Sequence, residues 1–284
     1  MRFAFTLTSA ESRRLIAKGV VKMPEVQAAL KNAYIIIAGG TTNAYVAQEL
    51  LSSKDIEPQR FTVGLSTSGV LCYTDAAKRH PIPMILYKGE VVKKTVSEAF
   101  DDFHLETIVI KGANAIDPEG NVGVITNAFN GGTVPQIIGT PTSQGLKYIT
   151  PVGLEKLVPS VKSAAKVTGA KLLNFTMGPS FGMFCLPNTM PVTEIEALKT
   201  LFNVKATHVA SGGIGGNEGA VTIVVEGEEK NVTDTLEFIK SSIKGEPAVP
   251  PLKSNCETCS MKECEFNGAN KADQPEWLQK GQQD

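Results

Sequence analysis

The hydrophobic pattern of the chain alternates between short apolar runs and helical stretches. Residues 34–37 are all apolar and predict a buried strand, which leads through a glycine turn into a helical pattern ending near Leu51. The same pattern predicts strands at residues 61–65, 83–87 and 107–110, and helices at residues 25–32 and 96–103. The predicted fold class is therefore α/β, with a mainly parallel Rossmann-like sheet and helices on both faces.

The N-terminus predicts a strand followed by a helix. Thr8 and Glu11 have the spacing of a capping box ahead of a helical stretch at residues 12–18. Gly19 is predicted to end that helix, since glycine is a weak helix former.

The pattern changes from about residue 165. It predicts a strand at residues 171–176, an irregular loop at 177–191, a helix at 193–202, strands at 204–210 and 220–226, and a helix at 232–243. This β-α-β-β-α order predicts a small ferredoxin-like α+β unit. Prolines at residues 247, 250 and 251 predict a stiff linker. We expect three segments: a Rossmann-like domain (1–164), the ferredoxin-like unit (165–245), and a linker with a Cys-rich tail (246–284).

The first candidate ligand site is the glycine turn after residue 37. Gly39 and Gly40 let the backbone approach a ligand, and the helix start that follows favours an anion such as a phosphate or carboxylate. The hydroxyls of Thr41 and Thr42 can cap the helix or bind the same anion. The motif is neither a dinucleotide fingerprint nor an ATP-type P-loop. The alternative is a strand-to-helix turn without a ligand.

The second candidate follows the strand at residues 107–110. Lys111, Asn114, Asp117 and Asn121 all come after the carboxyl end of a predicted parallel strand, where open α/β sheets bind ligands. We expect Asn114, Asp117 and Asn121 to orient or polarise a substrate, and Lys111 to neutralise its charge. The alternative is a structural turn, because residues 117–120 read Asp-Pro-Glu-Gly.

A third glycine-rich segment, residues 211–219, joins the last two predicted strands. Gly212, Gly213, Gly215 and Gly216 give it more glycine than a hairpin needs. It is interpreted either as a second backbone-rich ligand loop that closes the cleft or as a long flexible turn.

Together these motifs resemble the superfamily of sugar-phosphate isomerases, family I CoA-transferases and lactate-utilisation (LUD-type) proteins. Ala115-Ile-Asp followed by Gly120-Asn is similar to the Ala-Asp-x-x-Gly-Asn element of the CoA-transferases, and residues 152–158 resemble the segment after the sheet in LUD-type proteins. The resemblance covers roughly residues 2–160 at the level of pattern. It implies a Rossmann-like sheet and transferase- or isomerase-like chemistry.

The chain departs from these families at their catalytic residues. Ribose-5-phosphate isomerases carry Asp-Gly-Ala-Asp-Glu where this chain has Lys111-Gly-Ala-Asn-Ala. Both carboxylates for proton shuttling are missing, so isomerase chemistry of that type is not expected. CoA-transferases attack with a Glu in a Ser-Glu-Asn-Gly setting. The nearest text here, Gly-Asn-Glu-Gly at residues 216–219, makes Glu218 the corresponding nucleophile candidate in a different context.

The five cysteines are unevenly spread. Cys256, Cys259 and Cys264 crowd near the C-terminus, with the Cys-x2-Cys spacing that suits zinc or an iron–sulfur cluster. Three ligands are one short of a closed set, which Cys72, Cys185 or a partner would complete; alternatively, one iron of a cluster would stay open to substrate. The alternatives are redox-active or exposed thiols for the cluster, and small buried hydrophobes for Cys72 and Cys185.

Composition narrows the setting. The chain has 284 residues, 42% hydrophobic and 20% charged, with a net charge of −1 and no basic block, so neither nucleic acid nor an anionic membrane is an expected partner. No apolar run approaches the length of a membrane helix, and the first residues lack signal-peptide features. We therefore expect a cytoplasmic protein. A homo-oligomer is compatible with these features.

Three hypotheses follow for function. The first is an enzyme that binds a small anionic metabolite, namely a phosphorylated or carboxylated compound or a CoA ester, with a metal or iron–sulfur site in the tail. The second is a non-catalytic metabolite sensor or accessory protein that uses the tail cysteines for redox or cluster sensing. The third is a metal-trafficking or assembly protein whose tail docks a partner.

Overall fold

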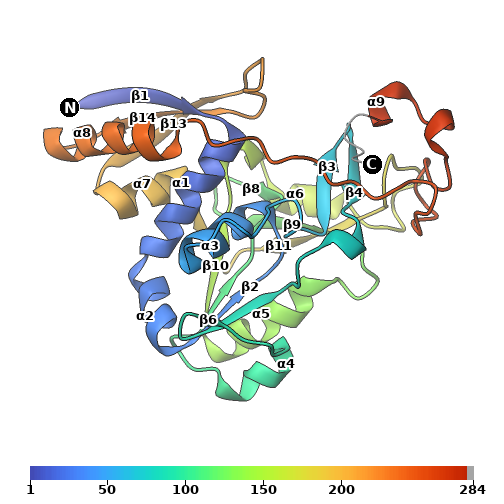
Figure 1. The fold of residues 1–284 in the computed structure, drawn as a ribbon, viewed down its shortest axis with the longest axis horizontal. Coiled ribbons are helices and arrows are strands. Elements are labelled where there is room, and N and C mark those ends of the chain that lie inside the picture. Colours follow the sequence, from blue (N-terminus) through green and yellow to red (C-terminus); the bar gives the residue numbers. More distant parts are fainter. Residues whose placement is uncertain (280–284) are drawn as a thin grey trace.

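The computed structural model describes residues 1–279 as a mixed α/β protein around a mostly parallel central sheet (Figure 1). The sheet order is β12-β10-β7-β2-β5-β6. Four strands pair in parallel: β12 (Met190–Val192), β10 (Lys147–Pro151), β7 (Ile108–Ile110) and β2 (Tyr34–Ile37). Strand β5 (Met84–Tyr87) pairs antiparallel with β2 and with the edge strand β6 (Glu90–Val91). The predicted fold class is confirmed at this level.

The apolar run of β2 faces a separate core on each side of the sheet. Ile35 and Ile37 pack into a core with helices α1 (Ser9–Lys22), α2 (Pro24–Asn32) and α3 (Thr41–Leu51). Tyr34 and Ile36 pack into a second core with α4 (Val96–Ala99) and α5 (Thr133–Gln144). A strand covered on both faces has no polar side, so four consecutive apolar residues are required there.

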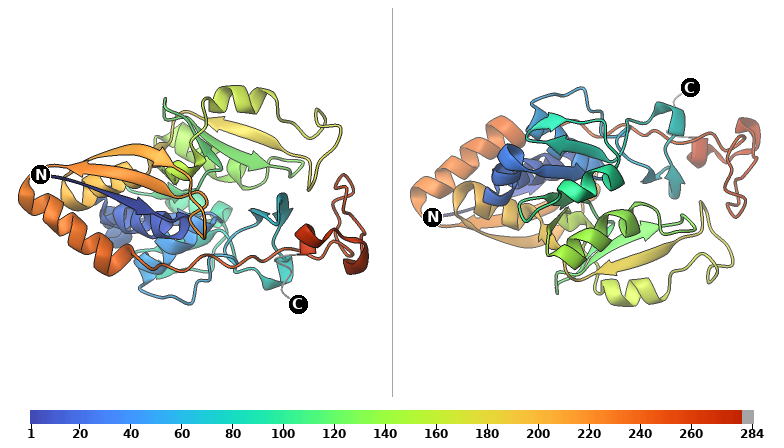
Figure 2. Two further views of the ribbon diagram at one scale, coloured as in Figure 1. Left: turned by 90° about the horizontal axis from the view of Figure 1, so that it is seen from above. Right: turned by 90° about the horizontal axis from the view of Figure 1, so that it is seen from below.

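A second, antiparallel sheet stands beside the first and carries α6 (Val161–Lys166) against it. Its strands, in the order β11-β9-β8, are β8 (Ala115–Ile116), β9 (Val122–Thr126) and β11 (Gly182–Leu186). On the other side of the central sheet, β3 (Gly64–Thr67) and β4 (Val70–Tyr73) form a hairpin. Figure 2 shows the β9–β11 sheet with α5 and α6 on one side of the molecule and the hairpin on the other.

Two predicted strands are wrong. The strand predicted at residues 61–65 begins only at Gly64, because Phe61 is fully buried in the turn before it and the chain then folds back at Ser68 and Gly69. The strand predicted at residues 171–176 is absent, and Leu172 and Phe175 are exposed. Strands β11 and β12 form instead within the stretch predicted as a loop.

A third sheet, in the order β1-β14-β13, draws on both ends of the chain. Strand β1 (Arg2–Leu7) pairs antiparallel with β14 (Val221–Glu226), which also pairs with β13 (Lys205–Ser211). Helices α7 (Glu194–Phe202) and α8 (Glu229–Phe238) accompany it, and a π turn (Ile239–Ile243) extends α8. Strand β1, which lies outside the predicted unit of residues 165–245, therefore completes this sheet. This sheet spans the boundary predicted at residue 164, and the division into three domains stays a prediction.

Helix α1 runs through Gly19 instead of ending there. A Cβ atom at this position would lie 2.5 Å from the Cβ of Ala197 in α7. The glycine therefore permits close packing of two helices, and the prediction that it ends the helix is wrong.

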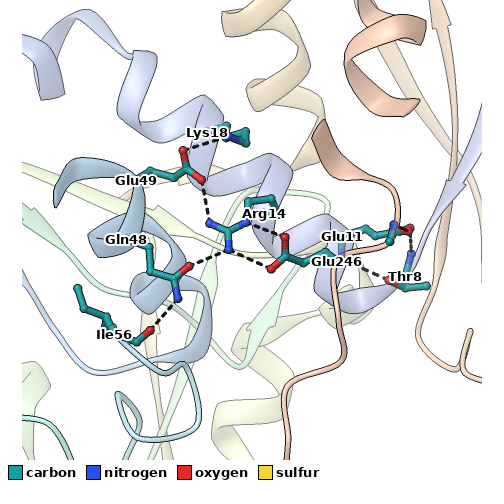
Figure 3. Close-up of polar contacts among 9 residues, drawn as sticks. Thr8, Glu11, Arg14, Lys18, Gln48, Glu49, Ile56 and Glu246 are labelled. Carbon is teal, nitrogen blue, oxygen red and sulfur yellow. Dashed lines mark hydrogen bonds and ion pairs between the residues drawn. The ribbon is translucent and has the colours of Figure 1, made fainter. Parts of the chain in front are cut away.

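Arg14 ties α1 to α3 and to the start of the tail (Figure 3). Its guanidinium makes a bidentate contact with Glu246, at 2.9 Å for both bonds, and donates to Glu49 at 2.8 Å and Gln48 at 2.7 Å. The Arg14 side chain is only 5% exposed, and bidentate charge-assisted bonds of this kind are the strong ones. The network fixes where the segment after residue 245 leaves the small sheet.

The tail then crosses to the β3–β4 hairpin, beside which it lies in both figures (Figures 1 and 2). Its backbone joins the hairpin through the bond from Ser254 N to Tyr73 O at 2.8 Å. Its short helical segments are a 3-10 turn (Lys271–Asp273) and α9 (Glu276–Gln279), and further 3-10 turns are Ala76–Lys78, Phe100–Asp102 and Leu154–Lys156. The last five residues of the predicted tail segment lie outside the described residues. Within residues 1–279 no helix is long and apolar enough to cross a membrane.

Candidate anion-binding cleft

A cleft of about 640 Å³ lies at the carboxyl ends of three neighbouring parallel strands. Strand β2 is followed by the glycine turn, β7 by Lys111, and β10 by the 3-10 turn that carries Glu155 and Lys156; all of these line the cleft. In open α/β sheets this edge is where ligands bind. The structure therefore brings two of the predicted sites, the turn at residues 39–42 and the segment at residues 111–114, into one cavity.

Two helices begin at the cleft, and no side chain caps either. Gly40 is the N-cap of α3 and Gly132 that of α5, with φ of 156° and 69°. Gly39, Thr41 and Thr42 line the cleft at the first helix start, and residues 131–134 line it at the second. The first amide groups of a helix lack intrahelical partners and carry its positive dipole end, so both starts favour an anion in the cavity.

Lys111 and Lys156 lie side by side on the floor of the cleft. Nζ of Lys111 donates to the carbonyl oxygen of Gly112 at 3.2 Å, and Nζ of Lys156 donates to that of Ala113 at 2.9 Å. Neither lysine makes an ion pair among residues 1–279. Burial and the positive charge of Lys156 lower the pKa of Lys111 to about 8. Two half-buried ammonium groups without a carboxylate partner attract a ligand anion.

The two lysines have different electrostatic surroundings. Burial also lowers the pKa of Lys156, and Arg13 adds to this effect, while Glu155 and Glu194 oppose it. No carboxylate opposes the lowering at Lys111. The proton is therefore held more firmly on Lys156 than burial alone would allow.

Asn114 presents a fixed donor to the cleft. Its Oδ1 accepts the N–H of Ile125 at 2.9 Å, which leaves its Nδ2 group directed away from that bond. The orientation of the amide follows from the bond, since only the oxygen can accept. Asn114 is thus suited to donate to a substrate oxygen, as the sequence predicts.

Arg13 and Glu155 form the only ion pair among the described residues that line the cleft, with 3.1 Å between Nη2 and Oε1. Arg13 leaves its buried Nε without a hydrogen-bond partner. With Lys111 and Lys156 counted, the lining carries three cations against one carboxylate, so its net charge is positive.

The walls of the cleft differ in character. Leu65 and Leu71 of the hairpin and Phe181 of the segment before β11 supply apolar surface, while threonine hydroxyls at positions 62, 126 and 133 add hydrogen-bonding groups. A few polar groups on an apolar lining are typical of small-molecule sites.

Asp117 and Asn121 do not line the cleft. Both are 4% exposed, and the Asp117 carboxylate accepts bonds from the Asn121 side chain and from the backbone N–H groups of Glu119, Asn121 and Val161. Burial raises the pKa of Asp117, but these donors outweigh it and hold the pKa below its usual value. In this structure the pair closes the β8–β9 turn and caps the start of α6.

The loop at residues 211–219 is exposed. Gly212, Gly213, Gly215 and Gly216 lie outside the cleft lining, and the Glu218 carboxylate accepts the N–H of Gly216 at 3.0 Å. Of this loop only Gly219 reaches the cleft.

The tail cysteines separate into two places. Cys256 packs against Cys72 of β4, and Cys72 lines the cleft. Cys264 instead pairs through its backbone with Thr176, in an isolated β-bridge. Burial raises the pKa of the Cys72 thiol, and the neighbouring Cys256 and Cys259 raise it further. Within residues 1–279 no three His, Cys, Asp or Glu side chains gather as the ligands of one metal ion. The metal set Cys256, Cys259 and Cys264 stays a prediction.

Buried Lys253 donates to the sulfur of Cys256 at 3.3 Å. Asn127, on the opposite wall of the cleft, donates to the sulfur of Met261 at 3.6 Å. Outside the cleft lining, the carbonyl oxygen of Thr176 accepts the N–H of Glu265 at 3.3 Å. We call residues 253–267 the strap, because it runs from the hairpin to the opposite wall.

Comparisons with known proteins add little. No protein-family model and no curated protein matches the chain. Among solved structures, a D-ribose-5-phosphate isomerase in complex with phospho-erythronic acid is a weak neighbour. It aligns with 81% of this chain and 85% of its own, at 15% sequence identity and a TM-score of 0.27. A likeness at that TM-score says nothing of the site.

Proposed function

We propose that the protein is an enzyme that binds a small phosphorylated or carboxylated metabolite in the cleft. The observation that supports this most strongly is the pair Lys111 and Lys156, which lies without a carboxylate partner beside two uncapped helix starts. The anion takes the place of the missing partner, and the glycine turn supplies backbone N–H groups to it.

The remaining lining suits the rest of the substrate. Nδ2 of Asn114 holds or polarises an uncharged oxygen, and the apolar wall of the hairpin and Phe181 excludes water from the opposite side. Because the catalytic carboxylates of the sugar-phosphate isomerases are missing at residues 111–115, the chemistry proposed here rests on the lysines and Asn114.

Thermal unfolding in the presence of anionic metabolites tests this function. We expect glycerol 3-phosphate, and not glycerol, to raise the unfolding temperature of the wild-type protein. Lys156→Met should remove most of the shift, while Lys240→Met, at an exposed position away from the cleft, should keep it. Failure of every phosphorylated and carboxylated compound to stabilise the wild type would count against the proposal.

A second candidate is a redox sensor that reports on the same cleft. It is favoured by the contact between Cys72, which lines the cleft, and Cys256 of the strap. Hydrogen peroxide would oxidise the Cys256 thiol, which lies beside Lys253, to a sulfenic acid with release of water. The Cys72 thiol would then displace water from it to form a disulfide.

Mass mapping after peroxide treatment separates the candidates. A sensor should form the Cys72–Cys256 disulfide and change its affinity for glycerol 3-phosphate at least several-fold, and Cys72→Ser should abolish the change. Cys185→Ser serves as the matched control, since Cys185 lies in β11 away from the strap cysteines. If peroxide does not change the affinity for glycerol 3-phosphate, the enzyme is the better supported of the two candidates.

A further inference from the structure

We infer that Lys111 is a nucleophile that forms a Schiff base with the carbonyl group of a small phosphorylated aldehyde or ketone. This inference rests on the proposed function and names the substrate class and the reacting residue. It depends on the placement of Lys111 among the groups that surround the cleft floor.

The first support for this inference is the position of Lys111 in the fold. Lys111 follows directly after β7, the strand between β2 and β10, so its side chain stands between the glycine turn on one side and Lys156 on the other. Its amine has a single described contact, the 3.2 Å bond to Gly112 O, which is long and holds it loosely. A substrate phosphate at the helix starts would bring a neighbouring carbonyl carbon within reach of this amine.

The charged groups around Lys111 assign separate roles to the two lysines. Lys156 is the charged neighbour that disfavours the ammonium form of Lys111, and the more distant charges of Glu155 and Glu194 oppose the lowering of its own pKa without forming an ion pair with it. Arg13 is held by Glu155 on the α1 side. Burial lowers the pKa of both lysines, and carboxylates oppose this lowering at Lys156 alone. Lys111 therefore supplies the neutral amine and Lys156 the proton.

The reaction balances without another reagent. The neutral Nζ of Lys111 attacks the carbonyl carbon, and one of its protons moves to the oxygen to give a carbinolamine. The Lys156 ammonium then protonates the hydroxyl, which leaves as water, and an iminium remains on Lys111. Nδ2 of Asn114 lies on the same floor and donates to the oxygen as the bond forms.

Phosphate and carboxylate, the two anionic groups that the proposed function allows, differ in charge and in their number of acceptor oxygens. A phosphate carries nearly two negative charges and three acceptor oxygens, which suit two helix starts and the Lys156 ammonium together. A single carboxylate would leave one helix start unused. The inference therefore commits to phosphorylated carbonyl compounds.

Reductive trapping on the full-length protein tests the inference. Wild-type protein is incubated with glyceraldehyde 3-phosphate or pyridoxal 5′-phosphate, reduced with borohydride, and mapped by peptide mass spectrometry. We expect an adduct on Lys111 at least tenfold more abundant than on Lys240, and competition by glycerol 3-phosphate. Lys111→Arg should abolish the adduct while keeping the positive charge.

The pH dependence of reductive trapping distinguishes a nucleophilic lysine from one that is labelled non-specifically. Trapping at Lys111 should rise with pH toward about 8, and Lys156→Met should change that profile because it removes the neighbouring charge. Labelling of Lys111 no greater than that of Lys240 would overturn the inference. If glycerol 3-phosphate still stabilised the protein in that case, the anion-binding function would survive and only the Schiff base would fail.

Discussion

The carboxylate of Glu194 accepts the backbone N–H of Leu154 at 3.0 Å, directly behind the floor of the cleft. Leu154 begins the 3-10 turn that presents Glu155 and Lys156 to the cleft, so Glu194 positions that turn from a fully buried site. Burial raises the pKa of Glu194 to about 7, and the charge of Glu155 adds to it, against hydrogen bonds that lower it.

This raised pKa predicts a loss of stability as the pH rises. Between about 4.5 and 7, folded protein keeps a proton on Glu194 that the unfolded chain has released, so the free energy of unfolding falls by roughly 3 kcal/mol across that window. Glu194→Gln keeps an acceptor for Leu154 and removes the titration. Urea denaturation should show that the free energy of unfolding of the variant, relative to that of the wild type, is higher at pH 8 than at pH 5. An equal pH dependence in both proteins would refute the assignment.

Gly19 and Gly139 make a matched pair of helical glycines. An alanine Cβ at Gly19 would lie 2.5 Å from the Cβ of Ala197, whereas nothing lies within 4 Å of one at Gly139. Gly19→Ala should lower the free energy of unfolding by about 1–3 kcal/mol through overpacking. Gly139→Ala should raise it by about 0.5–1 kcal/mol through helix propensity. Both changes are measured by chemical denaturation, and the same sign for the two would contradict the packing at Gly19.

The Arg14 network predicts a large loss of stability on truncation. Arg14→Met leaves the partly buried Glu246 without its ion-pair partner and Glu49 with Lys18 alone, and breaking a comparable buried pair costs about 3–5 kcal/mol. Proteolysis should then cut near residues 246–251 faster, because Glu246 no longer anchors the tail. Lys230→Met removes an exposed pair with Asp234 and should change stability by no more than about 0.5 kcal/mol. Equal losses in the two variants would argue against the network.

Metal analysis tests the prediction for the tail. Anaerobic purification with iron, sulfide and zinc determination should find metal that falls in Cys256→Ser, Cys259→Ser and Cys264→Ser. Comparing Cys72→Ser with Cys185→Ser then decides the fourth ligand, since Cys72 packs with Cys256 whereas Cys185 lies in β11. If the wild type and every variant are free of metal, the alternative of redox-active thiols remains for these cysteines.

Local patterns predicted the central part of the site from the sequence. The apolar run of β2, the glycine turn after it, Lys111 and Asn114 all follow from strand ends, which sequence marks well. Lys156 and Arg13 were missed, because their importance comes from a 3-10 turn after β10 and from a helix face that no local pattern connects to the cleft.

Longer-range features escaped prediction for physical reasons. Helix α5 was missed because Pro135, Gly139 and Pro141 give its sequence low helix propensity, and tertiary packing of Val134 and Ile137 outweighs this. Strand β1 pairs with β14 across more than two hundred residues, which periodicity does not reveal. Asp117 and Asn121 have the residue types of a catalytic pair as well as the sequence of a turn, and their shared hydrogen bonds favour the turn.

The central claim is that the positive charge of Lys111 and Lys156 attracts a phosphate into the cleft. Isothermal titration calorimetry with glycerol 3-phosphate, at pH 7 and pH 9, measures it most directly. Affinity should fall at the higher pH as Lys111 loses its proton, and Lys111→Met combined with Lys156→Met should weaken binding at least a hundredfold at pH 7. Wild-type binding that neither pH nor the double substitution changes would place the anion elsewhere and contradict the account.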